Sequence, residues 1–68
     1  MTALELIAQI QNESGLSRYA WAKLTRIPVS TVNMILGQGR SPGRRTLARL
    51  AAAYPERRQE ITAILLST

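Results

Sequence analysis

The strongest constraint on the fold is a proline that interrupts helical sequence near the middle of the chain. Pro28 has no backbone N–H and disfavours the helical conformation at Ile27, so a helix cannot run through this point. Apolar residues recur at helical spacing on both sides of the break. They are Ala20, Trp21 and Leu24 before it, and Val32, Ile35 and Leu36 after it. The sequence therefore predicts two short helices, over about residues 17–25 and 29–36, with a sharp turn at Arg26 and Ile27 between them.

Three further helices are predicted from similar patterns. Residues 2–5 have the spacing of a capping box, and Gly15 can adopt the left-handed conformation that closes the helix after them. After a glycine-rich loop over 37–43, a helix begins near Arg44, and Pro55 ends it and opens the last helix, over about 55–66. Their apolar stripes are Ala3, Leu6, Ile7 and Ile10; Leu47, Leu50, Ala51 and Tyr54; and Ile61, Ile64 and Leu65. Because no segment alternates as a strand does, we expect an all-α protein, one compact five-helix bundle over residues 1–68.

The composition excludes several classes of function. The chain of 68 residues contains no cysteine and no histidine, so it has no disulfide, no thiolate chemistry, no ordinary metal site and no histidine base. Its four carboxylates all lie near the ends, and we therefore expect neither an enzyme nor a cofactor. No apolar run approaches the ~20 residues of a membrane span, and the N-terminus lacks a signal-peptide layout. We expect a cytoplasmic bacterial or phage protein with no membrane contact and no domain for a small-molecule effector.

The charge is distributed unevenly along the chain. The formal net charge is +5, and no acidic residue lies between Ser14 and Pro55. That interval contains seven cations, which are Arg18, Lys23, Arg26, Arg40, Arg44, Arg45 and Arg49. A solvated protein surface normally mixes both signs, which is the alternative explanation. An unmixed basic segment is typical of a protein that binds nucleic acid.

With these features, about residues 16–54 resemble the Cro/XRE-type helix-turn-helix family of phage and bacterial repressors. The matching residues are Leu16-Ser17, Trp21-Ala22, Ile27, Val32-Asn33-Met34-Ile35, Arg40-Ser41-Pro42, Thr46-Leu47 and Leu50-Ala51. There are departures from the family pattern at four positions. Arg26 replaces the turn glycine, Pro28 replaces the polar cap, and Leu36 and Gln38 replace a glutamate and a glycine. The resemblance implies a lambda-repressor-like fold with a helix-turn-helix over about residues 17–37.

The resemblance also implies which residues read DNA bases. Carried over by position, they are Val29, Ser30, Asn33 and Met34, with Thr31 near the edge. Asn33 has the groups to pair with adenine, and Val29 offers a methyl surface to thymine. Two alternatives stay open: Ser30 and Asn33 keep the helix soluble, or Met34 fills a gap against the following loop.

The cations are the candidates for phosphate contacts. The candidate phosphate group consists of Arg18, Tyr19, Arg40, Arg44 and Arg45, which lie at the starts of two predicted helices and around the loop. Lys23, Arg26 and Arg49 are either further contacts or solvated side chains. Arg57 and Arg58 are expected to pair locally with Glu56 and Glu60.

These features lead to two hypotheses about function. The first is a sequence-specific regulator of transcription, a homodimeric repressor that binds a pseudo-palindrome on double-stranded DNA, often beside its own gene. Ile61, Ile64 and Leu65 form the candidate dimer contact, and packing onto the protein's own core is the alternative. The second is a protein-interaction module, such as an antitoxin or phage accessory factor, that also binds its own operator.

Overall fold

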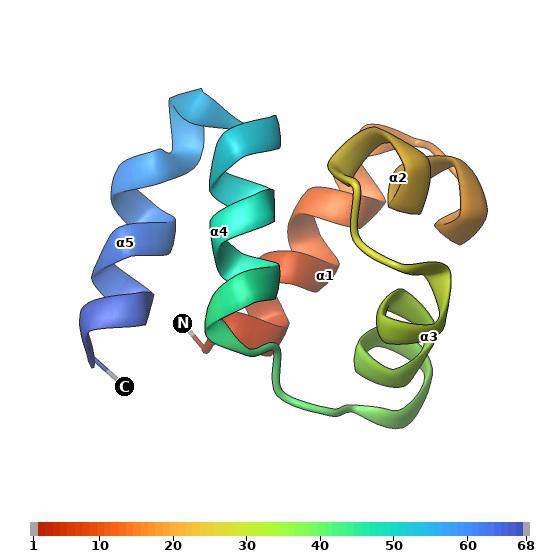
Figure 1. The fold of residues 1–68 in the computed structure, drawn as a ribbon, viewed down its shortest axis with the longest axis horizontal. Helices are drawn as coiled ribbons and strands as arrows, with labels where there is room; N and C mark the ends of the chain where they lie inside the picture. Colours follow the sequence, from red (N-terminus) through yellow and green to blue (C-terminus); the bar gives the residue numbers. More distant parts are fainter. Residues whose placement is uncertain (1, 68) are drawn as a thin grey trace.

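The computed structural model describes residues 2–67, and this part of the chain is helical throughout, apart from short connections. The helices are α1 (Ala3–Ser14), α2 (Arg18–Thr25), α3 (Val29–Gln38), α4 (Arg44–Ala53) and α5 (Arg58–Ser67), with a 3-10 turn, η1 (Pro55–Arg57), before α5. The predicted all-α five-helix bundle is confirmed. In Figure 1, α4 and α5 lie side by side, and α2 contacts α4 on its other side and packs with α1 and α3.

Local sequence signals determine both ends of α1. The Thr2 hydroxyl accepts a hydrogen bond from the Glu5 N–H at 3.1 Å, and the Glu5 carboxylate accepts one from the Thr2 N–H at 2.9 Å. This second bond, from the backbone of Thr2, holds the pKa of the Glu5 carboxyl below its ordinary value. Gly15 ends the helix with φ of 69°, in the left-handed region. The predicted capping box and closing glycine are confirmed.

The turn between α2 and α3 contains a residue in an unfavourable backbone conformation. Arg26 has φ of 61°, and it is the one non-glycine residue with positive φ among residues 2–67. Its carbonyl oxygen accepts a hydrogen bond from Arg49 Nη1 of α4 at 3.0 Å. Pro28 then precedes α3 as its N-cap residue. The break predicted at Arg26 and Ile27 is therefore in place, and Arg26 bears the backbone strain that a glycine would have avoided.

Helix α3 continues two residues beyond the predicted end. Gly37 and Gln38 are helical, and the left-handed turn occurs at Gly39, with φ of 70°. The Gly39 N–H donates to the Ile35 carbonyl at 3.1 Å, which closes the last turn. The prediction of a loop from residue 37 was wrong at its start, because the first glycine does not end the helix and the second one does. The connection to α4 consists of residues 39–43.

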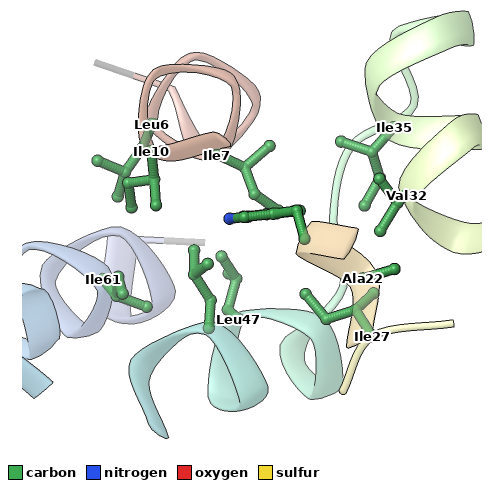
Figure 2. Close-up of a cluster of buried hydrophobic side chains, with 11 residues drawn as sticks. Leu6, Ile7, Ile10, Ala22, Ile27, Val32, Ile35, Leu47 and Ile61 are labelled. Carbon is green, nitrogen blue, oxygen red and sulfur yellow. The ribbon is translucent and has the colours of Figure 1, made fainter. Parts of the chain in front are cut away.

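The core takes apolar side chains from every α helix and from the turn after α2. Its buried members are Leu6, Ile7, Ile10, Trp21, Ala22, Ile27, Val32, Ile35, Leu47, Leu50 and Ile61, and most are labelled in Figure 2. Trp21 is fully buried, and its indole Nε1–H donates to the Tyr54 hydroxyl at 3.0 Å. The large apolar residues of the predicted stripes are buried or pack against this core, with one exception on α2, and the small Ala20 is half-buried.

The exception is Leu24, which the sequence placed on the apolar face of α2. Leu24 is 55% exposed, whereas Thr25 is buried. The Thr25 hydroxyl donates to the Trp21 carbonyl at 2.9 Å, so its burial leaves no unpaired polar atom. The buried side of the helix is centred between Trp21 and Ala22. Thr25, four residues after Trp21, lies on that side, and Leu24 lies on the flank.

The prediction of local pairing for Arg57 was also wrong. Arg57 Nη2 forms an ion pair with Glu13 Oε1 of α1 at 2.8 Å, and it is the single ion pair among the described residues. Glu13 is far away in sequence, but the return of the chain after α4 brings the two side chains together. Arg58, the second residue of the prediction, forms no ion pair within the described part of the chain.

Candidate nucleic-acid interface

The exposed side of α3 is the candidate reading face, which consists of Val29, Ser30, Thr31, Asn33 and Met34. Val32 and Ile35 point into the core, so Ser30 and Asn33 face outward, and Thr31 and Met34 lie at the edges of the buried side. Ser30 and Asn33 are exposed, Val29 is 40% exposed, and Thr31 and Met34 are half-buried. No side-chain hydrogen bond ties Ser30 or Asn33 to another residue between 2 and 67. Their polar groups are therefore open to an external partner.

Met34 contacts the start of the loop after α3. Its sulfur lies 3.3 Å from Arg40 Nη1, a weak hydrogen bond in which the guanidinium donates. This contact corresponds to the gap-filling alternative for Met34. It also places the guanidinium of Arg40 beside the candidate reading face.

Arg18 approaches the same helix from α2. Its Nη1 lies close to Gly37, at 3.2 Å from the position that a Cβ atom on Gly37 would occupy. The Ser17 hydroxyl accepts a hydrogen bond from the Ala20 N–H at 3.2 Å, so the helix start that carries Arg18 is well defined. Two residues predicted to contact phosphate, Arg18 and Arg40, thus lie against α3 near its C-terminal half.

Tyr19, on α2, is also exposed. Its ring is 59% exposed, and the ammonium group of Lys23 lies 4.6 Å from the ring centroid. This is the geometry of a cation–π contact on the solvent side of α2. The Tyr19 hydroxyl makes no hydrogen bond to another described residue, so it is available as a donor.

Arg44 and Arg45 are exposed in the first turn of α4, directly after the 39–43 loop. No side chain caps this helix start, because the N-cap residue is Gly43. Two cations at the positive end of a helix dipole are unfavourable for the isolated protein. An anion bound there would remove that cost and pair with the open N–H groups. In Figure 1 this helix start and the loop lie at the same end of the molecule as the end of α3.

The remaining central cations differ in their surroundings. The Arg49 guanidinium donates a hydrogen bond to the Arg26 carbonyl, so it binds the α2–α3 turn. Arg26 and Lys23 are exposed, and neither forms an ion pair with another residue between 2 and 67. The contacts of Arg18 with Gly37 and of Arg49 with Arg26 were not predicted. No local signal predicts them, because each joins residues about 20 positions apart in different parts of the fold.

The candidate dimer residues lie mostly on the inner side of α5. Ile61 is 1% exposed and belongs to the protein's own core, so the packing alternative holds for this residue. Ile64 and Leu65 are half-buried and pack against the core, whereas Leu66 is 79% exposed. A groove of about 310 Å³ runs between α4 and α5 beside them. Its lining consists of Leu47, Ala48, Ala51, Ala52, Arg58, Ile61, Thr62 and Leu65.

Within residues 2–67, no three His, Cys, Asp or Glu side chains come together as a metal site would need, and no helix has the length and apolarity of a membrane span. No family model, curated protein or solved structure matches this chain. The likeness to the Cro/XRE-type family therefore depends on the motif residues themselves.

Proposed function

We propose that this protein is a sequence-specific double-stranded-DNA-binding regulator of transcription, in which α2 and α3 form a helix-turn-helix of the Cro/XRE type. The observation that carries the proposal is the uncharged, exposed face of α3 with unpaired arginines beside it. A helix fits the major groove, and small polar or methyl-bearing side chains on it reach base edges. Arginines around it neutralise phosphates and set the orientation of the protein.

Each group of residues has its own role in this proposal. Asn33 and Ser30 hydrogen-bond to base edges, and Val29 contacts a thymine methyl group. Arg18, Arg40, Arg44 and Arg45 contact phosphates, and Tyr19 donates its hydroxyl to another. Because α3 has no arginine, guanine is not read from its centre, and DNA shape contributes to the choice of site.

We propose further that the protein acts as a homodimer and represses by covering a promoter. One module of this size neutralises few phosphates, and two copies ~34 Å apart on a pseudo-palindrome gain affinity and selectivity together. Leu66 and the α4–α5 groove are the exposed apolar surface on α5 that a second copy would cover. The proposal includes no catalytic role.

Two substitutions test the roles of the candidate reading face and of the candidate phosphate group separately. Fluorescence anisotropy is measured with DNA from upstream of the protein's own gene and with random DNA of equal length, over a series of salt concentrations. Asn33→Ala should weaken binding to the upstream DNA by about 1–3 kcal/mol and leave random DNA unchanged. Arg44→Ala should weaken both DNAs alike and reduce the salt slope by about 1.

The control is an exposed side chain on α5. Gln59→Ala matches the loss of a polar side chain, and Gln59 does not line the α4–α5 groove. It should change neither the discrimination between the two DNAs nor the salt slope. Wild-type binding that does not depend on salt concentration would refute the proposal, because the phosphate contacts would then be missing.

The exposed Leu66 and the groove also favour the second candidate function, a protein-interaction module. Light scattering of the purified protein distinguishes the two. A stable dimer that is lost on Leu66→Gln supports self-association. A monomer in light scattering supports the interaction module if the protein purified from its native cells carries a second protein in equal amount.

A further inference from the structure

Gly37 is unusual because it lies inside a helix without a local reason for glycine. It belongs to α3, and it is not among the glycines with positive φ. Glycine is one of the least favourable residues in a helix interior, because the unfolded chain gains most freedom from it. The closing turn of α3 is made by Gly39 instead. Most other residues at position 37 would thus stabilise the helix more than glycine does.

The structure offers a different reason for the missing side chain. A Cβ atom on Gly37 would lie 3.2 Å from Nη1 of Arg18, which is tighter than an ordinary van der Waals contact. Gly37 is the single glycine among residues 2–67 whose added Cβ would meet another atom within 4 Å. The space above Gly37 is thus occupied by the guanidinium of a residue on another helix.

The guanidinium at this position is not held by an acceptor on the protein. The Arg18 side chain forms no ion pair and no hydrogen bond with another residue of the described chain. Its helix also does not favour a cation there, because Arg18 is the first residue of α2, at the positive end of the helix dipole. The guanidinium thus lies where a side chain on residue 37 would project, and its N–H donors stay free.

We propose that Gly37 is a positioning residue, which seats the Arg18 guanidinium against α3 so that it meets a backbone phosphate in a fixed relation to the candidate reading face. This inference rests on the proposed DNA binding. The planar guanidinium donates two parallel hydrogen bonds to phosphate oxygens, a geometry that depends on its orientation. Gly37 thereby links a phosphate contact from α2 to the helix that reads the bases.

The test uses two substitutions of increasing size at position 37. A Cβ atom at position 37 requires the flexible Arg18 guanidinium to move by only a few tenths of an ångström. Gly37→Ala should therefore raise the melting temperature, because alanine favours the helix, and weaken binding to upstream DNA only slightly. Gly37→Leu should displace the guanidinium further and weaken binding more. Loss of the Arg18 contact removes about one phosphate per bound protomer, which lowers the salt slope by about 0.9. Between 50 and 200 mM salt, Gly37→Leu should thus lose about 3.5-fold less affinity than the wild type.

A double-mutant cycle shows whether the effect passes through Arg18. Arg18→Ala alone should lower the affinity and the salt slope, and in that background Gly37→Ala and Gly37→Leu should have no further effect on binding. Gln38→Leu is the bulk control, because it adds the same side chain about 100° around the helix. It should leave the salt slope unchanged.

The outcomes separate this inference from the proposed function. A Gly37→Leu variant that keeps the wild-type salt slope, or that weakens binding equally with and without Arg18, would overturn the positioning role alone. A wild-type protein that binds no DNA would overturn both. A higher melting temperature together with a reduced salt slope supports the inference, because a purely structural role of Gly37 would not separate the two.

Discussion

Replacement of Arg26 by glycine should stabilise this protein. Arg26 adopts φ of 61°, and its Cβ atom is crowded by the following peptide in this conformation. The left-handed conformation costs a non-glycine residue about 1–2 kcal/mol, and Arg26→Gly removes that cost. The added freedom of glycine in the unfolded chain offsets about 0.5–1 kcal/mol of the gain. The hydrogen bond from Arg49 remains, because its acceptor is the backbone carbonyl of residue 26.

With mid-range values of about 1.5 kcal/mol for the cost and about 0.75 kcal/mol for the offset, the expected net gain for Arg26→Gly is about 0.75 kcal/mol, or ~3–6 °C in melting temperature for a domain of this size. Urea and thermal unfolding, followed by circular dichroism at pH 7, measure it. Arg26→Ala is the matched control, since it removes the guanidinium but keeps the Cβ atom, and it should give no such gain. If the glycine variant is no more stable than the alanine variant, positive φ at residue 26 is not a source of strain.

Three further predictions concern the core, the capping box of α1 and the exposed side of α2. Tyr54→Phe should cost about 1–3 kcal/mol in urea unfolding, because it leaves the buried Trp21 indole N–H without an acceptor. The Glu5 pKa is lower in the folded protein than in the unfolded chain, so its contribution to stability is present at neutral pH and is lost as pH falls through the folded pKa. Glu5→Gln should therefore flatten the acid limb of a plot of melting temperature against pH, and an unchanged limb would contradict this assignment. Leu24→Gln should change the free energy of unfolding by less than about 0.5 kcal/mol, because Leu24 is exposed, and a loss typical of a core leucine would refute its placement.

The sequence determined the features that depend on neighbouring residues. The hydrogen bonds of the capping box of α1 join residues three apart. Pro28 lacks an N–H and restricts the backbone of Ile27, so its effect is also local. The exposure of Ser30 and Asn33 followed in the same way, because Val32 and Ile35 point the opposite side of the helix inward. Helix boundaries, turn positions and the exposed side of α3 were therefore predictable to within about three residues, the largest difference being the start of α5 at Arg58, where a helix from Pro55 was predicted.

Tertiary structure decided which side of α2 is buried and where the arginines point. Leu24 and Thr25 differ by one position, and only the packing of the other helices around Trp21 selects the threonine for the core. Arg57 bonds to Glu13, Arg49 to the Arg26 carbonyl, and Arg18 lies on Gly37. An arginine side chain is long and flexible, so its partner is whichever group the fold brings within reach. Sequence spacing alone does not contain that distance, which depends on how the helices cross.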